Sequence, residues 1–230
     1  MTTLIVMAKE CVPGRVKTRL HPPLSLADAA RLAQACLDDT VARTRAVGER
    51  RVLCLQGSLP PIAGFAQVPQ VPGDLDERIG AVLDQVRGPV LLIGMDTPQV
   101  DPVLLQRLAN EWPRDADAWF GPAADGGFWL LGLSELPGRS RGDLVRGVPM
   151  SRSDTGRNTR DRLVRAGLRV RDVPELSDID DIASLRVVAR EVDPAGRVAS
   201  VLRELRREGA LDGVVVPRGG LVARRGAEVA

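Results

Sequence analysis

Two lysines, Lys9 and Lys17, lie in one short segment of a chain that otherwise uses arginine for positive charge. They are the only lysines among 32 lysine and arginine residues. The segment follows an apolar run, contains the turn-forming pair Pro13-Gly14, and also carries Arg15 and Arg19. Arginine binds phosphate oxygens in pairs, whereas lysine is a compact, movable charge. With the backbone amides of the turn, these cations predict a loop that binds a di- or triphosphate.

The alternative for this basic loop (residues 9–19) is a solvated surface segment whose cations bind no ligand. It lacks the Gly-x-x-x-x-Gly-Lys-Ser/Thr pattern of a P-loop, and no Gly-x-Gly-x-x-Gly pattern occurs in the chain. These absences disfavour P-loop kinases and dinucleotide-dependent dehydrogenases. His21 is the only histidine and lies in His-Pro-Pro without a recognisable nucleophile elbow, which disfavours a Ser-His-Asp hydrolase.

Three aspartates follow predicted strands, where a buried carboxylate needs a cation or several hydrogen-bond donors. Asp96 comes directly after Leu91-Leu-Ile-Gly94. Asp178 and Asp180 are two residues apart, so on an extended segment their side chains point the same way and could hold one cation together. Mg²⁺ and Mn²⁺ bind such carboxylates and take waters and substrate phosphates as their other ligands. These acids therefore predict a divalent-cation site.

Helix capping is the alternative for both groups of acids. Asp96 or Thr97 could cap a helix over 101–111 that Pro98 would start. Asp178 and Asp180 precede another predicted helix, whose N-terminus attracts negative charge. Pattern alone leaves both interpretations open.

A glycine-rich segment, Gly121-Pro-Ala-Ala-Asp-Gly-Gly-Phe128, follows another predicted strand. Gly126 and Gly127 allow the backbone to approach a ligand closely. Asp125 could orient an acceptor or act as a base. The alternative is a tight hairpin turn, for which Asp-Gly is a strong signal, and function could be layered on such a turn.

Apolar strands alternate with helices along the chain, which predicts an α/β fold with a mostly parallel sheet covered on both faces. In such sheets ligands bind beyond the carboxyl ends of the strands, which is where the basic loop and the aspartates fall. The residues 57–73 read as loop with a short strand. We expect strands over 3–8, 51–55, 89–94, 116–121, 126–132 and 168–173, and helices over 25–47, 75–86, 101–111, 153–166, 177–192 and 195–208.

The length of 230 residues predicts one domain over 1–208, followed by a flexible tail over 209–230. A net charge of +2 argues against nucleic-acid or membrane partners. No apolar run approaches the roughly 20 residues of a membrane span. Three cysteines without a Cys-x-x-Cys pair, and no signal peptide before the first strand, predict a reduced, cytoplasmic setting. The oligomeric state is not predicted.

Five segments occur in the order Met7–Leu20, Gly73–Arg78, Ile93–Pro98, Gly121–Phe128 and Asp178–Asp180. Together they resemble the motifs of a bacterial family with a glycosyltransferase-A (GT-A) fold, long catalogued as a domain of unknown function and often labelled glycosyltransferase. Some members are linked by name to arsenosugar biosynthesis. The resemblance covers about residues 3–190 and implies a Rossmann-like nucleotide-diphospho-sugar transferase fold. Phospholactate and phosphoenolpyruvate guanylyltransferases and the molybdenum-cofactor nucleotidyltransferases are similar to it.

The resemblance implies roles for individual residues. Lys17, Asp96 and Asp125 would be catalytic, and Asp96, Asp178 and Asp180 would hold Mg²⁺ or Mn²⁺. Asp125, Gly126 and Gly127 would contact the acceptor. The nucleotide and its phosphates would be bound by Ala8, Lys9, Gly14, Arg15, Lys17, Arg19, Gly73 and Asp74.

Three positions depart from the family pattern and affect the acceptor side. Ser184 stands where the family has a second acid after Asp-x-Asp, Met150-Ser151 replaces Trp-Ser, and Asp76 replaces a glycine. The metal-type acids are kept.

The resulting expectation is an enzyme, a metal-dependent transferase with a nucleotide-activated donor and a small-molecule acceptor. Glycosyl transfer from a nucleotide sugar is the leading hypothesis. The first alternative is nucleotidyl transfer, in which a phosphorylated or acidic metabolite attacks a nucleoside triphosphate and pyrophosphate leaves. The second is a non-catalytic nucleotide-binding protein.

Overall fold

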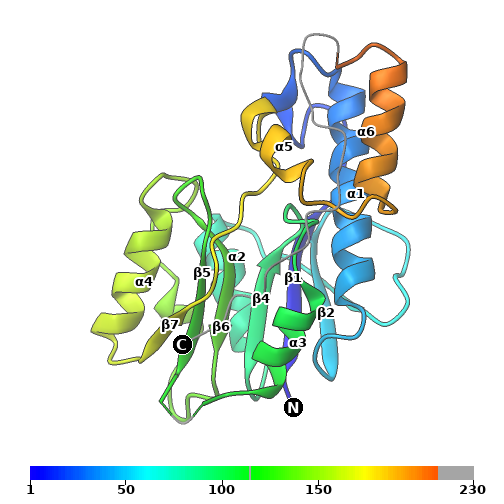
Figure 1. Ribbon diagram of the computed structural model, residues 1–230. Coiled ribbons are helices and arrows are strands. Elements are labelled where there is room, and N and C mark those ends of the chain that lie inside the picture. Colours follow the sequence, from blue (N-terminus) through cyan, green and yellow to red (C-terminus); the bar gives the residue numbers. More distant parts are fainter. Residues whose placement is uncertain (114, 212–230) are drawn as a thin grey trace.

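A seven-stranded, mostly parallel sheet forms the centre of the protein, as a computed structural model describes it for residues 1–113 and 115–211 (Figure 1). Most of the predicted flexible tail, residues 212–230, lies outside the described residues. The strands follow the order β3-β2-β1-β4-β6-β5-β7. Their bounds are β1 Thr3–Lys9, β2 Arg50–Gln56, β3 Ala66–Pro69, β4 Val90–Gly94, β5 Ala118–Pro122, β6 Phe128–Leu133 and β7 Val170–Asp172.

The direction of each strand decides which loops meet. β1 pairs in parallel with β2 and β4, and β5 pairs in parallel with β7. β6 alone is antiparallel to its neighbours β4 and β5. The segments that follow β1, β4, β5 and β7 therefore reach the same edge of the sheet. The predicted α/β class and mixed, mostly parallel sheet are confirmed.

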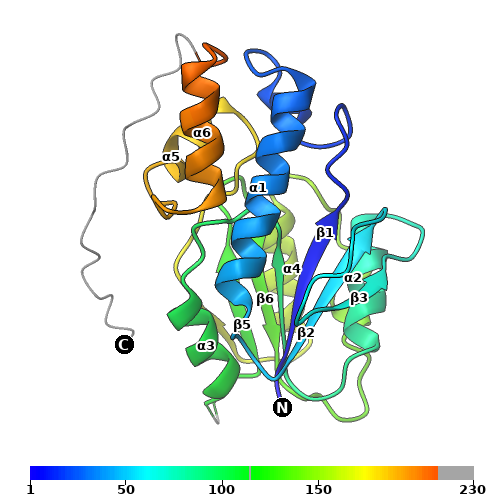
Figure 2. The same ribbon diagram turned by 90° about the vertical axis from the view of Figure 1, so that its right-hand side faces the viewer.

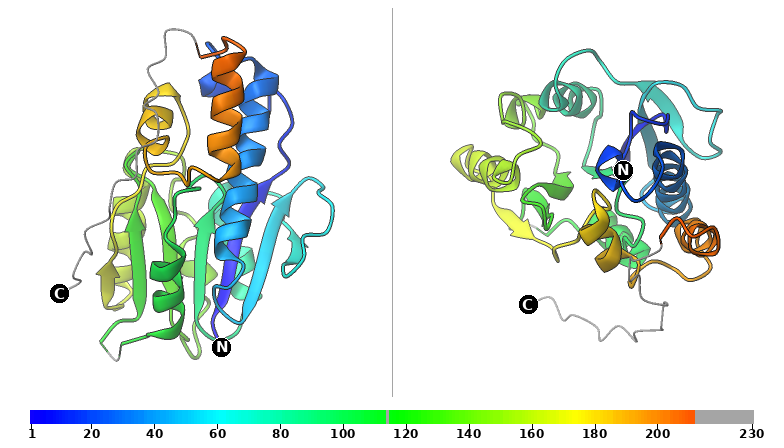
Figure 3. Two further views of the ribbon diagram at one scale, coloured as in Figure 1. Left: turned by 45° about the vertical axis from the view of Figure 1, so that its right-hand side comes forward. Right: turned by 90° about the horizontal axis from the view of Figure 1, so that it is seen from above.

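Helices cover both faces of the sheet, as the view from above shows (Figure 3). α1 (Leu26–Thr44) and α3 (Pro102–Asn110) pack on the face that receives Leu4 and Val6 of β1. α2 (Leu75–Asp84) and α4 (Thr155–Arg165) pack on the face that receives Ile5 and Met7. Successive β1 residues thus enter opposite cores, as the two-residue period of a strand requires.

A third apolar cluster lies beyond the carboxyl edge of the sheet. There α5 (Ile182–Val188) and α6 (Arg197–Arg207) pack on the N-terminal half of α1 (Figure 2). This helical group forms one side of the space above the strand ends. Among the described residues, no helix combines the length and apolar composition that a bilayer crossing requires.

Asp39 joins α1 to α6 by capping the latter's N-terminus from outside. Its two carboxylate oxygens accept hydrogen bonds from the backbone amides of Arg197 and Val198, at 2.8 and 2.9 Å. Gly196, at the N-cap itself, offers no side chain. Asp39 is 7% exposed, so its loss would leave two amides at a partly buried helix end without a partner.

We expect Asp39→Ala to lower the free energy of unfolding by about 1.5–3 kcal/mol, the usual range for hydrogen bonds to a charged group. Urea unfolding followed by circular dichroism would measure it. Asp38→Ala is the matched control, since Asp38 is exposed and, among the described residues, its side chain bonds only to Gln34 on the same helix. A change at position 39 no larger than at position 38 would contradict the capping role.

Candidate functional site

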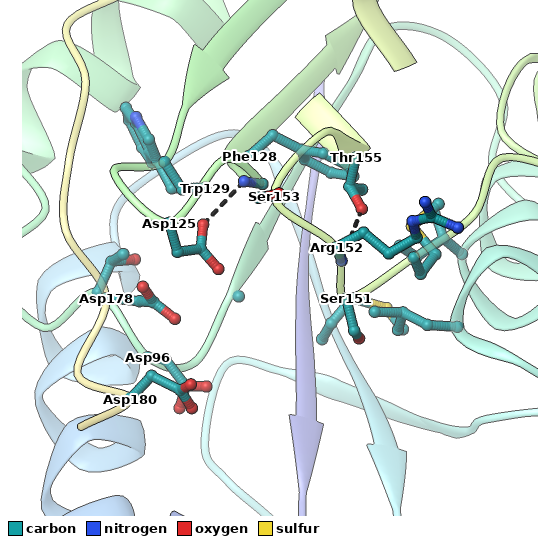
Figure 4. Close-up of a pocket in the computed structure, with 18 of the residues that line it drawn as sticks. Asp96, Asp125, Phe128, Trp129, Ser151, Arg152, Ser153, Thr155, Asp178 and Asp180 are labelled. Atoms are coloured by element: carbon teal, nitrogen blue, oxygen red, sulfur yellow. Dashed lines mark hydrogen bonds between the residues drawn. The ribbon is translucent and has the colours of Figure 1, made fainter. Parts of the chain in front are cut away.

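A pocket of about 570 Å³ opens at the carboxyl edge of the sheet (Figure 4). Its acidic side is formed by Asp96 after β4, Asp125 between β5 and β6, and Asp178 and Asp180 before α5. The opposite side is formed by the segment 150–153 and by apolar side chains from α2 and β6. Four predicted site residues from three separate loops thus line one pocket.

Asp96 does not cap the helix that follows it. α3 begins at Pro102, and Asp101 is its N-cap, with a side chain that accepts from the Val103 amide at 2.9 Å. The capping interpretation of Asp96 and Thr97 is therefore wrong. Asp96 is left to face the pocket.

The second group of acids is likewise not a cap. α5 begins at Ile182 rather than at Ser177, because Asp181 and Ser184 form a capping box, with the Ser184 amide donating to Asp181 at 2.8 Å. Asp178 and Asp180 precede this box on non-helical backbone and line the pocket. Ser184, which departs from the family pattern, serves the cap.

The side chain of Lys17 is buried where the basic loop meets the carboxyl edge of the sheet. Its side chain is 6% exposed, and its Nζ lies 2.7 Å from Asp96 Oδ2. Burial lowers the pKa of Lys17, but the charge of Asp96 and the hydrogen bond to it outweigh burial and hold that pKa above its ordinary value. Lys17 has φ of 48°, a left-handed conformation that is uncommon outside glycine. The solvated-loop alternative therefore fails for Lys17.

The other cations of the loop surround a smaller pocket of about 210 Å³ that adjoins the first. Lys9 and Arg15 line it, and Arg19 lines both pockets together with Asp96 and Asp180. Arg19 is 75% exposed and lies 2.6 Å from Asp180 Oδ2. The two pockets thus meet along a boundary made of two ion pairs.

Four of the residues predicted to bind the nucleotide line neither pocket. Ala8 is buried in the core, and Gly14 is exposed with φ of 77° at the turn of the loop. Asp74 lines a neighbouring pocket of about 420 Å³. Gly73 is held by its carbonyl, which accepts from Arg78 Nε at 2.7 Å.

Asp125 lies in a tight hairpin turn between β5 and β6, as the hairpin interpretation expected. Its Oδ1 accepts from the Gly127 amide at 2.8 Å, which fixes the carboxylate at the pocket wall (Figure 4). Gly126 has φ of 90°, and a Cβ there would lie 2.0 Å from the Ser153 carbonyl oxygen. The close approach that Gly126 permits is thus to the protein backbone, while Gly127 lines the pocket.

The segment before α4 contributes pocket residues that sequence reasoning did not nominate. Ser151, Arg152, Ser153 and Thr155 line the pocket opposite the acids (Figure 4). Ser151 has φ of 56°, and Thr155 Oγ1 accepts from the Arg152 amide at 3.0 Å. The departure at Met150-Ser151 was the one available signal. It gave no role, because the docking of this segment on the Gly126 turn is a tertiary contact.

Four carboxylates line the pocket, and one of them is buried enough to have a raised pKa. Burial is the main reason why the pKa of Asp178 rises to about 6; Lys17 opposes the rise, and Asp125 and Asp96 add to it. Over residues 1–113 and 115–211, no three acids, cysteines or histidines converge closely enough to hold a metal ion by themselves. Mg²⁺ usually takes only one or two carboxylates, and phosphates and waters complete its shell. The donors present fit such a cation.

Comparison with known proteins places the chain among bacterial transferase-like folds. The model of one family, described as an uncharacterized protein conserved in bacteria (DUF2064), matches residues 29–152. This match includes Asp96 and the Gly126 turn but neither the basic loop nor Asp178 and Asp180. A comparison with curated proteins gives no significant match.

Two solved structures share the fold. A protein of Desulfovibrio desulfuricans G20, provisionally described as a nucleotide-diphospho-sugar transferase, is 25% identical, with a TM-score of 0.78 over 90% of this chain and 95% of that one. A cytidylyltransferase of Leptospira borgpetersenii serovar Hardjo-bovis is 10% identical, with a TM-score of 0.50 over 96% of this chain and 99% of that one. The first confirms the predicted nucleotide-diphospho-sugar transferase fold. The second shows likeness of fold alone.

Proposed function

Since the chain belongs to the bacterial family DUF2064, we propose that it is a metal-dependent transferase of that family that uses a nucleotide-activated donor. Glycosyl transfer from a nucleotide sugar to a small acceptor is the leading form of the proposal. The similarity to the Desulfovibrio protein supports it.

The contact between the basic loop and the acids carries the proposal. Lys17 and Arg19 each meet an aspartate at the carboxyl edge of the sheet, Asp96 and Asp180. Transfer from a nucleoside diphosphate needs cations for the phosphates and carboxylates for a metal side by side, because the departing group gathers negative charge. Lysine is rarely buried unless it is paired, and the partner of Lys17 is an acid that lines both pockets.

In this mechanism the basic loop binds the diphosphate in the smaller pocket, where Lys9, Arg15, Lys17 and Arg19 neutralise its oxygens. Asp96, Asp178 and Asp180 would hold the divalent cation. Mg²⁺ or Mn²⁺, when bound, supplies charge neutralisation on the phosphates.

The acceptor would lie in the larger pocket, against the turn that carries Asp125. With its Oδ1 held by the Gly127 amide, Asp125 presents Oδ2 to an acceptor hydroxyl and orients it or takes its proton. Ser151 and Ser153 offer hydroxyl groups on the opposite wall, and Phe128 and Met150 give that wall apolar surface. This combination suits a small polar molecule with one apolar face.

Nucleotidyl transfer is the second candidate. The four cations around the smaller pocket favour it, because departing pyrophosphate, which has no esterified oxygen, carries more negative charge than a departing nucleoside diphosphate. A nucleotide-binding protein without catalysis is the third.

Incubation with Mg²⁺ separates these candidates. Each nucleoside triphosphate is supplied with a panel of phosphorylated metabolites, and each common nucleotide sugar is supplied alone. We expect slow release of nucleoside diphosphate from one nucleotide sugar and no reaction of triphosphates. Pyrophosphate release would instead establish the second candidate. Saturable binding with no turnover of any donor would leave only the third.

A further inference from the structure

Two of the acids that would hold a metal are paired, in the free protein, with two of the cations that would hold phosphate. Lys17 Nζ lies 2.7 Å from Asp96, and Arg19 Nη1 lies 2.6 Å from Asp180. In the part of the chain that the structure describes, no other ion pair joins the basic loop to the acids of the pocket. Two of the three acids and two of the four cations are thus engaged before any ligand arrives.

Binding of either ligand alone would break this balance. A divalent cation on Asp96 would displace Lys17, and the ammonium of this buried side chain would then lack a counter-ion. Phosphate on Lys17 would leave Asp96 unpaired in a pocket that the carboxylates of Asp178 and Asp180 also line. Only the two ligands together leave every group paired, because the carboxylates pass to the metal while the cations pass to the phosphates.

The conformation of the loop holds the free-state pairing in place. Lys17 is left-handed, and a single 3₁₀ turn, Thr18–Leu20, follows it directly. Leu20 is fully buried, which anchors the end of this turn. The backbone thus directs Lys17 inward to Asp96.

We propose that Lys17 and Arg19 act as internal stand-ins for the metal, and that an exchange of partners makes the binding of a divalent cation and of a diphosphate strongly interdependent. Lys17 carries most of the effect because it is buried, and Arg19 adds a smaller part. The inference rests on the proposed use of a metal and a nucleotide at this site. It adds that neither ligand binds tightly alone, and reciprocity requires the same coupling factor in both directions.

The test measures binding of Mn²⁺ by electron paramagnetic resonance, with and without inorganic pyrophosphate. Pyrophosphate is the probe because both candidate donors contain a diphosphate group. Free Mn²⁺–pyrophosphate formation is measured separately and subtracted. Wild-type protein should bind Mn²⁺ about 5–150-fold more tightly when pyrophosphate is present. Lys17→Met removes the stand-in and keeps the aliphatic bulk. It should bind Mn²⁺ alone about tenfold more tightly than wild type and lose most of the coupling.

Two further variants keep the result interpretable. Arg19→Met changes an exposed residue, so folding is preserved, and it should tighten Mn²⁺ binding by about fivefold at most. Arg15→Met is the matched control, because Arg15 lies in the same loop and makes no ion pair within the described residues. It should weaken pyrophosphate binding and leave the affinity for Mn²⁺ alone unchanged.

If Lys17→Met and Arg19→Met both bind Mn²⁺ alone no more tightly than Arg15→Met, the exchange is refuted. Equal Mn²⁺ affinity of the wild type with and without pyrophosphate would refute it as well. These outcomes are distinct from a failure of the proposed function, since they require no turnover. If Mn²⁺ and pyrophosphate bind interdependently but the protein transfers nothing, the exchange of partners stands and the proposed transferase function fails.

Discussion

Asparagine at position 96 should lower turnover of the donor about 10²–10³-fold, the usual cost of losing one electrostatic contact to a developing charge. Asp96 lines both pockets and faces Lys17, so its charge serves the metal and the loop together. Asparagine keeps the shape of the side chain and removes the charge. The measurement is kcat for donor turnover at saturating Mg²⁺.

Loss of folding must be separated from loss of chemistry in this variant. Lys17 would keep its position without a charged partner, so the free energy of unfolding should fall by about 1–3 kcal/mol. Turnover is therefore compared below the thermal transition of the variant. Asp101→Asn is the control, because asparagine caps a helix about as well as aspartate does and Asp101 caps α3. Turnover of Asp96→Asn within threefold of this control would remove Asp96 from the mechanism.

Gly126→Ala should cause the largest loss of stability among single-methyl changes at this site, about 4 kcal/mol. A positive φ of 90° costs an alanine about 1–3 kcal/mol. The new Cβ would also lie 2.0 Å from the Ser153 carbonyl oxygen, which adds about 1–3 kcal/mol of overpacking. Since the Gly126 carbonyl also accepts from the Gly156 amide at 2.8 Å, relief by movement would pull the hairpin away from α4.

Gly64→Ala separates the backbone cost from the overpacking cost. Gly64 has φ of 85°, and a Cβ there would meet no atom within 4 Å, so only the backbone cost remains. Calorimetry should show Tm of Gly126→Ala falling by about 8–16 °C, and that of Gly64→Ala by about a quarter to three quarters of this. Equal losses would mean that the contact with Ser153 is not close in solution.

Much of the fold could be predicted because its signals are local. The continuous apolar runs of β1 and β4 identify buried strands. Ser25, a residue type typical of helix N-caps, caps α1 and accepts from the Asp28 amide at 3.1 Å. The seven-stranded order could not be read in this way, because pairing of β6 between β4 and β5 depends on contacts between distant segments.

The candidate site was likewise predictable in part. Residue types alone select the cations of the basic loop and the acids after three strands, since phosphate and Mg²⁺ impose those chemistries. Local pattern could not tell Asp96 from Asp101, or Asp180 from Asp181, because all four precede helices. The N-cap is the aspartate at which the helix begins, Asp101 for α3 and Asp181 for α5. Where each helix begins depends on how the preceding segment packs, which the local sequence does not show.

The sequence by itself therefore determined the fold class, the basic loop and a set of carboxylates suited to a cation. The tertiary structure alone decided their partners. Lys17 was expected to face phosphate, and it faces Asp96, while Arg19 meets Asp180 from 161 residues away. The physical reason is that charge type belongs to the residue, whereas pairing and burial depend on which strand ends the sheet brings together.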